Sequence, residues 1–158
     1  MITSTANQKI KRIMKLQKKA KARNEEGIFI VEGIRMMKEA PESRIKELYI
    51  SETFLQKYPD LPENLKKKAE MVSDPVFAHM SDTKTPQGIL GVIQRKPWTM
   101  EELLQEENGR APFLMVLDHL QDPGNLGTIL RTAEGAGVTG VILGSNCADL
   151  YQPKVIRS

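Results

Sequence analysis

The last third of the chain carries the pattern that most constrains the fold. Phe113–Leu117 is a continuous apolar run, typical of a parallel strand that is covered on both faces. The polar loop Asp118–Pro123 follows, then helical periodicity over Gly124–Gly135, and then a second apolar run, Val138–Leu143. This order predicts a right-handed βαβ unit, which presents ligands at the carboxyl ends of its strands. A final helix is expected to begin near Pro153.

The residues up to Arg95 predict a separate domain. Short strand-like and helix-like segments alternate along them, which predicts an α/β/α sandwich of roughly a hundred residues or fewer. The expected elements are, in order, a helix to about Arg23, a strand at Ile28–Val31, a helix at Ile34–Ala40, a strand at Ile45–Ser51, a helix at Glu52–Tyr58, a helix leading into a short strand at Leu65–Met71, a helix at Asp74–Met80 and a strand at Ile89–Gln94.

Between these two regions the composition changes. Lys96-Pro97-Trp98 ends the last strand of the first region, and glutamates crowd a short helical stretch before Asn108-Gly109. We therefore expect a first domain at residues 1–95, a linker at residues 96–111, and an incomplete second domain at residues 112–158. Trp98 is expected to anchor the linker by packing rather than to stack on a base.

Positive charge is concentrated at the N-terminus. Met1–Arg23 contains eight Lys or Arg residues and no acidic one, so 15 of the chain's 23 basic side chains remain elsewhere against 20 acidic ones. A residue among Thr3–Thr5 is expected to cap a helix that runs to about Arg23. Such a basic helix suits an acidic polymer such as RNA, and a solvated helix face is the alternative. The candidate contacts are Lys11, Arg12, Lys15 and Lys18.

A loop rich in Pro and Gly leads into the helix of the βαβ unit. Asn125 stands near the helix N-terminus, where its side chain can cap the helix or bind a ligand. Gly127 and Arg131 are four residues apart and share a helix face, which leaves room for a ribose or phosphate against the guanidinium. The loop lacks the patterns Gly-x-Gly-x-x-Gly and Gly-Lys-Ser/Thr, which disfavours a dinucleotide-dependent oxidoreductase and a nucleotide hydrolase. An ordinary capped helix with a solvated Arg is the alternative.

Asn125-x-Gly127-x-x-x-Arg131, on a strand, loop and helix, resembles the first signature of the SpoU (TrmH) family of RNA ribose methyltransferases, part of the SPOUT superfamily. Resemblance in several segments over nearly the whole chain is far more specific than one motif. The other segments that resemble the family are, in chain order, Phe29–Gly33, Thr85–Gly88, the flanks Leu117-Asp118 and Ala133–Gly137, and Tyr151–Ser158.

The resemblance implies a function and a fold. Members of the family transfer a methyl group from S-adenosyl-L-methionine to a ribose 2′-hydroxyl in ribosomal or transfer RNA. Their N-terminal α/β/α sandwich binds RNA, and a parallel α/β, Rossmann-like domain with a knotted C-terminal part binds the donor and forms a homodimer. Asn125 and Arg131 match catalytic positions, with Gly127 beside them at the substrate. A cytoplasmic protein with no membrane partner and no metal is expected.

Chemistry limits the role of Arg131. The sulfonium of the donor is already electrophilic, so the enzyme must align the reacting groups and help the 2′-hydroxyl to lose its proton. A guanidinium is almost never deprotonated in a protein, so Arg131 is expected to stabilise the developing alkoxide or to grip the adjacent phosphate. His119, in the loop after the first strand of the βαβ unit, is the second candidate for a general base.

The second and third family signatures, which supply the knot, the donor pocket and most of the dimer interface, are expected beyond Ser158. The cofactor-binding residues are therefore unknown, and the chain as given is expected neither to bind the donor nor to methylate RNA. A non-catalytic RNA-binding protein that uses the first domain alone is the alternative.

The lone Cys147 excludes an internal disulfide and a Cys-cluster metal site, and the N-terminus lacks a secretory signal.

Overall fold

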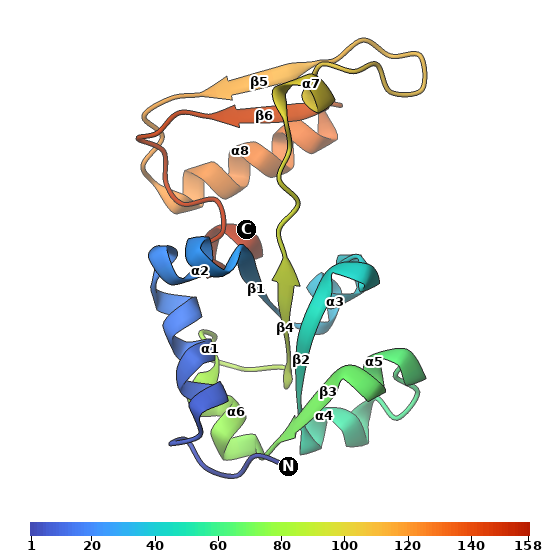
Figure 1. The fold of residues 1–158 in the computed structure, drawn as a ribbon, viewed down its shortest axis with the longest axis vertical. Helices are drawn as coiled ribbons and strands as arrows, with labels where there is room; N and C mark the ends of the chain where they lie inside the picture. Colours follow the sequence, from blue (N-terminus) through green and yellow to red (C-terminus); the bar gives the residue numbers. More distant parts are fainter. The chain divides into compact units, whose positions relative to one another are not determined.

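The computed structural model describes all residues from Met1 to Ser158. The chain forms two compact units, Met1–Arg95 and Lys96–Ser158 (Figure 1). None of its helices is both long and apolar enough to cross a bilayer. No three His, Cys, Asp or Glu side chains come together in a way that could hold a metal ion.

A mixed four-stranded sheet forms the centre of the first unit, in the order β1-β4-β2-β3. β4 lies antiparallel to both β1 and β2, whereas β3 lies parallel to β2. The central strand β4 is buried from Ile89 to Ile93, as burial on both faces of a sheet requires. The strands are β1 (Ile28–Glu32), β2 (Ile45–Ser51), β3 (Ala69–Val72) and β4 (Ile89–Gln94).

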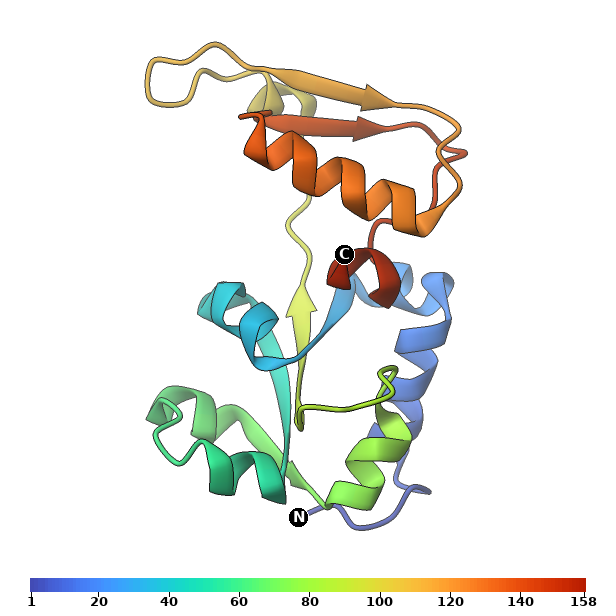
Figure 2. The same ribbon diagram turned by 180° about the vertical axis from the view of Figure 1, so that it is seen from behind.

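Helices cover both faces of this sheet. The two views place α1, α2 and α6 on one side and α3, α4 and α5 on the other (Figures 1 and 2). Alternate strand residues supply the two cores: Ile30 and Val92 pack toward the first side, and Val31 and Ile93 toward the second. The α/β/α sandwich expected from the sequence is therefore confirmed. The helices are α1 (Gln8–Lys18), α2 (Ala20–Glu26), α3 (Ile34–Glu39), α4 (Glu52–Lys57), α5 (Glu63–Lys68) and α6 (Asp74–Met80), with a 3₁₀ turn at Glu42–Arg44.

The N-terminal helix differs from the expected one at both ends. Its cap is Asn7, whose side chain accepts the Lys9 N–H at 2.8 Å, and the helix breaks at Lys19, where the backbone is extended. The buried Arg23 explains the break, because its Nη1 donates to the carbonyls of Leu16 at 2.6 Å and Gln17 at 2.9 Å. These carbonyls lie in the last turn of α1, where a helix leaves such groups without partners of its own. The single helix predicted to reach about Arg23 was wrong, and two helices stand in its place.

The second unit contains the expected βαβ arrangement. β5 (Leu114–Leu117) and β6 (Gly140–Leu143) are parallel, and α8 (Pro123–Gly135) connects them. A short helix, α7 (Met100–Leu103), precedes β5, and α9 (Pro153–Arg157) follows β6. In the chain as it stands β5 is not covered on both faces, because Val116 is 67% exposed.

Candidate functional site

The start of α8 lies at the carboxyl end of β5, where an α/β unit places its ligands. Asp122 caps the helix: its Oδ1 accepts the Asn125 backbone N–H at 2.7 Å. This capping role was expected of Asn125 as one possibility, but the structure gives it to Asp122. The Asn125 side chain is exposed and has no hydrogen-bond partner in the chain, so its amide is available to a ligand.

The two residues predicted to be catalytic do not face the same point. Asn125 and Arg131 are six residues apart in α8, which separates their side chains by about 120° around the helix. Arg131 is exposed, and its Nη1 donates a hydrogen bond to the carbonyl of Ser158. This bond orients the guanidinium, and its other N–H groups remain available as hydrogen-bond donors.

The space expected over Gly127 is filled in the structure. A Cβ at this position would lie 2.1 Å from Cβ of Ser158 and 3.3 Å from the carbonyl oxygen of Val155. Gly127 is buried for this reason, and it allows α9 to approach α8 closely. In this structure Ser158 and the carbonyl of Val155 lie in the space where the sequence predicted a ribose or phosphate.

His119 has partners that sequence reasoning missed. Its Nδ1 lies 2.9 Å from Oδ2 of Asp118, and its Nε2 lies 3.1 Å from Nδ2 of Asn146. If the Asn146 amide donates to Nε2, the ring proton stands on Nδ1 and is donated to Asp118. His119 also has a φ of +55°, a conformation that costs a residue with a side chain some strain. Asn146 follows β6 as His119 follows β5. Because the carboxyl ends of parallel strands lie at the same edge of a sheet, this placement could have predicted that the two side chains meet.

The lysines of α1 form an exposed basic face. Lys11, Lys15 and Lys18 are exposed, and no carboxylate lies within 4.0 Å of any of them. They recur at intervals of four and three residues, which places them along one side of the helix. We call these three residues the α1 lysine face.

Arg12 does not belong to that face. Its Nη1 lies 2.8 Å from Oε1 of Glu47, and its Nε lies 3.1 Å from Oε2 of Glu26. Hydrogen bonding to Glu26 raises the pKa of Arg12 above its usual range, with Glu47 adding to the effect. Glu47 is held in turn by the Tyr49 hydroxyl, which donates to it at 2.7 Å. Two carboxylates thus pair with Arg12 in this conformation, which argues against the predicted contact of this residue with RNA.

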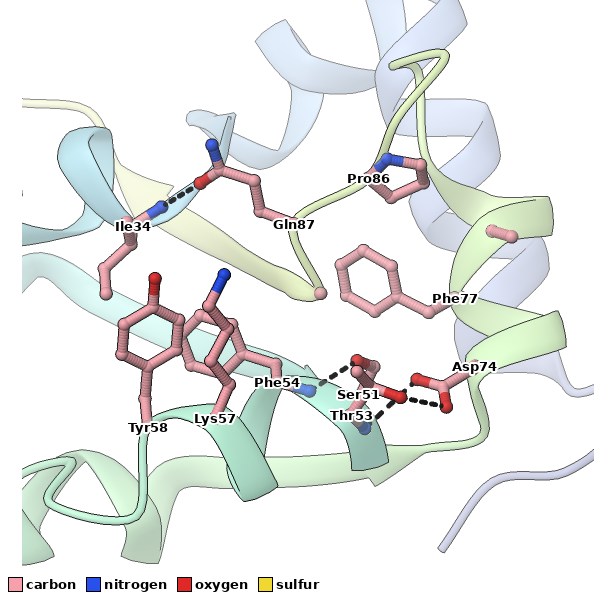
Figure 3. Close-up of a pocket in the computed structure, with 12 residues that line it drawn as sticks. Ile34, Ser51, Thr53, Phe54, Lys57, Tyr58, Asp74, Phe77, Pro86 and Gln87 are labelled. Carbon is pink, nitrogen blue, oxygen red and sulfur yellow. Dashed lines mark hydrogen bonds between the residues drawn. The ribbon is translucent and has the colours of Figure 1, made fainter.

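A pocket of about 550 Å³ lies in the first unit (Figure 3). It has walls from α4 and α6, and a rim from the loop before β4 and the first residue of α3. Thr85–Gly88 resembles the SpoU family, but the pocket was not predicted from the sequence, since α4, α6 and this segment are distant in the chain. The residues that line it include Ile34, Lys57, Tyr58, Asp74, Phe77 and Gln87.

Glu32 holds the loop that carries this rim. The buried Glu32 carboxylate accepts hydrogen bonds from the hydroxyl of Thr83 at 2.8 Å and from the backbone N–H of Asp82 at 3.3 Å. The Ser81 hydroxyl donates to the same carboxylate. A buried carboxylate is costly unless such donors surround it, so these bonds fix the loop against the end of β1.

Two family models match the chain, one in each unit. Residues 7–91 match the MRM3-like substrate binding domain, and residues 112–158 match the SpoU rRNA Methylase family. The first match spans more than half of the chain.

The relatives and solved structures agree with these matches. The chain is 34% identical over 161 residues to the 23S rRNA (guanosine(2553)-2′-O)-methyltransferase RlmP of Bacillus subtilis, covering 99% of this chain and 59% of that protein. It is 26% identical to an rRNA methyltransferase from Sinorhizobium meliloti, with a TM-score of 0.81 and coverage of 99% and 59%. A structure of an AdoMet-bound rRNA methyltransferase from the same organism matches with the same TM-score, 0.81. The chain thus spans less than two thirds of the relatives it matches.

Proposed function

The chain belongs to the SpoU rRNA methylase family, and we propose on that ground that the protein containing it transfers a methyl group from S-adenosylmethionine to a ribose 2′-hydroxyl of ribosomal RNA. The observation that carries the proposal is the Asn125-x-Gly127-x-x-x-Arg131 motif at the start of a helix that follows a parallel strand. Ribosomal RNA is preferred to transfer RNA because the RlmP relative is named for a 23S rRNA nucleotide.

In this proposal the first unit holds the RNA and the second contributes to the reaction. The α1 lysine face neutralises phosphates of the RNA, since its three ammonium groups have no carboxylate partner. Phosphate contacts of this kind position a nucleic acid without reading its sequence. Base recognition must therefore come from other residues.

Arg131 acts on charge rather than as a base. Its guanidinium stays protonated, so it stabilises the negative charge that develops on the 2′-oxygen or on the neighbouring phosphate. Its planar, forked donors suit this role better than a lysine ammonium would. Asn125, with a free amide at the helix N-terminus, supplies a further donor to the ribose or phosphate.

The methyl donor supplies an electrophilic carbon when bound, but its site is not assigned to residues of this chain. A pocket of about 570 Å³ in the second unit is lined by Trp98, Glu102 and residues Thr139–Val141, at the amino end of β6. The motif lies at the opposite, carboxyl end of the strands, and none of its residues lines that pocket. The residues present therefore do not form a cradle for the donor beside Arg131. A homodimer, as in the family, is part of the same proposal.

The test is genetic and chemical. The gene that encodes the chain is deleted, and 2′-O-methylated riboses in ribosomal and transfer RNA are mapped by their resistance to alkaline cleavage. We expect one ribosomal RNA methylation to disappear, to return with the wild-type gene, and not to return with Arg131→Ala. An unchanged methylation map would reject the enzyme and leave a non-catalytic RNA-binding protein. Full restoration by Arg131→Lys would reject the forked, oriented role of the guanidinium.

A further inference from the structure

The pocket of the first unit combines flat apolar walls with polar groups. The Phe77 ring lies beside it in α6. The side chains of Lys57, at the end of α4, and of Tyr58, the next residue, extend toward the loop that carries Gln87 (Figure 3). Phe77 is buried and Tyr58 is half-buried, so the two rings are held in place by packing. Because Phe77 is only 1% exposed, the half-buried Tyr58 ring is the aromatic surface that a flat ligand can contact.

Gln87 is oriented so that its side-chain NH₂ group remains available to donate hydrogen bonds. Its Oε1 accepts the backbone N–H of Ile34 at 3.0 Å, which fixes the direction of the amide. The NH₂ group has no partner in the chain and can donate to a ligand. Lys57 is a second donor, since its ammonium meets no carboxylate and lies 5.6 Å from the centre of the Tyr58 ring.

The backbone at Gly88 shapes the pocket. Gly88 has a φ of +88°, and a Cβ there would lie 2.4 Å from Oγ of Ser51. Only glycine fits this conformation and this close approach to β2. The Pro86-Gln87 segment is thereby brought over the start of α4, with Glu32 holding the same loop further back.

We propose that this pocket binds a single unstacked nucleobase of the RNA substrate. The identification of the ligand as part of an RNA rests on the proposed function, whereas the presence of the pocket does not. Proteins that read RNA sequence bind splayed bases by stacking them on aromatic side chains and bonding their edges. Here the Tyr58 ring supplies the apolar contact, and the Gln87 amide and Lys57 ammonium donate to carbonyl or ring-nitrogen acceptors. The volume, about 550 Å³, falls in the range of small-molecule sites.

A phosphate fits this pocket less well. Its lining contains Lys57 but also the Asp74 carboxylate, which accepts the Thr53 backbone N–H at 3.2 Å and the Thr53 hydroxyl at 2.6 Å. The N–H of Ile34, which an anion could use, is already bonded to Gln87. The walls are therefore close to neutral, which suits a base rather than an anion.

The position of the pocket favours RNA over a protein side chain. α1 packs on α6, the helix that supplies Phe77 and Asp74. A strand held by the α1 lysine face would thus lie one helix away from the pocket, within the same unit. In this proposal the α1 lysine face holds the backbone of the RNA, and the pocket binds one of its bases.

The experiment is an NMR titration of the 158-residue chain with the four 5′-mononucleotides, with ribose 5-phosphate and with phenylalaninamide. We expect saturable shifts at the Gln87 side-chain amide and at the backbone amides of Tyr58 and Gly88, with affinities that differ among the bases. Ribose 5-phosphate should leave these signals in place. Equal shifts with ribose 5-phosphate would mean a phosphate site, and shifts with phenylalaninamide alone would mean a protein side chain. Either result, or no shift with any nucleotide, overturns the proposal.

A pair of variants tests whether the Gln87 side-chain amide donates a hydrogen bond to the nucleotide. Gln87→Glu keeps an oxygen that can accept the Ile34 N–H but loses the NH₂ donors, and we expect about fivefold weaker nucleotide binding. Gln56→Glu makes the same change at an exposed position of α4 that does not line the pocket, and it should bind as the wild type does. Equal binding by all three proteins would contradict the role of Gln87. Free nucleotides report on the pocket even if the methylation map is unchanged, so the two proposals fail separately.

Discussion

Arg12 and Glu47 form an ion pair in which Nη1 of the arginine lies 2.8 Å from Oε1 of the glutamate. The same guanidinium also bonds Glu26, so one side chain ties α1 both to α2 and to β2. Lys11, directly before Arg12, and Lys15, about one turn after it, have no such partner. Neighbouring basic residues of one helix thus differ in role. Arg12 is held by carboxylates of the fold, whereas Lys11 and Lys15 are available to a ligand.

We predict that Arg12→Ala destabilises the first unit but leaves RNA affinity nearly unchanged. The variant leaves Glu26 and Glu47 without their shared cation, and because the group is partly solvated the cost is about 1 kcal/mol. Urea denaturation measures the loss. Lys11→Ala is the matched control in the same helix, and it should retain stability while weakening RNA binding. Loss of RNA affinity with full stability in Arg12→Ala would contradict this division.

The α1 lysine face gives a prediction about salt. Replacing Lys11, Lys15 and Lys18 by Glu should abolish binding to single-stranded RNA, because three phosphate contacts become repulsive. In the wild type these contacts should contribute about 2 to the slope of log affinity against log salt concentration. Fluorescence anisotropy with a labelled oligonucleotide measures both quantities. A control with the same charge change, Lys38, Lys46 and Lys67 to Glu, should bind far better, and equal loss in both triple variants would refute a specific face.

Two glycines of α8 should respond oppositely to alanine. Gly127→Ala places a Cβ 2.1 Å from Cβ of Ser158, so α9 must move and the cost is about 1–3 kcal/mol. Gly135→Ala meets nothing within 4 Å and should be neutral or stabilise by about 0.5 kcal/mol, since alanine favours helix. Native-state hydrogen exchange of α8 amides measures both effects. Equal stability of the two variants would show that α9 does not pack on Gly127.

Asp74 gives a prediction about pH. Hydrogen bonding from the Thr53 hydroxyl lowers the pKa of Asp74 below its usual range. A lowered folded-state pKa stabilises the fold above the unfolded-state pKa of about 3.9, and this contribution is lost as pH falls through the folded-state value. Asp74→Asn should therefore be less stable than the wild type at neutral pH, by under about 1 kcal/mol because the group is mostly solvated.

The difference for Asp74→Asn should shrink below about pH 4, where the wild-type carboxylate becomes protonated too. Thermal denaturation between pH 2 and pH 7 would follow it. Asp60→Asn serves as the control, since that carboxylate accepts no hydrogen bond in the chain. A constant difference across this range would show that the bond to Thr53 does not depend on the charge of Asp74.

Much of the fold could be predicted from sequence because its signals are local. The period of the apolar residues distinguishes strand from helix, so β2 (Ile45–Ser51), α6 (Asp74–Met80) and β4 (Ile89–Gln94) have the bounds that the pattern indicated. The break at Lys19 was not predictable in this way. It depends on a buried arginine that bonds carbonyls of the preceding helix, and nothing in the spacing of residues reveals that contact.

Some features of the candidate site likewise follow from the sequence, whereas others depend on the tertiary structure. The sequence by itself determined the order of the elements, the basic N-terminal helix and the motif from Asn125 to Arg131, because each depends on residues close together in the chain. Only the tertiary structure decided that Arg12 is paired, that Ser158 fills the space over Gly127, and that α4, α6 and Gln87 enclose a pocket. Those facts depend on distances between residues far apart in the chain, and packing sets such distances.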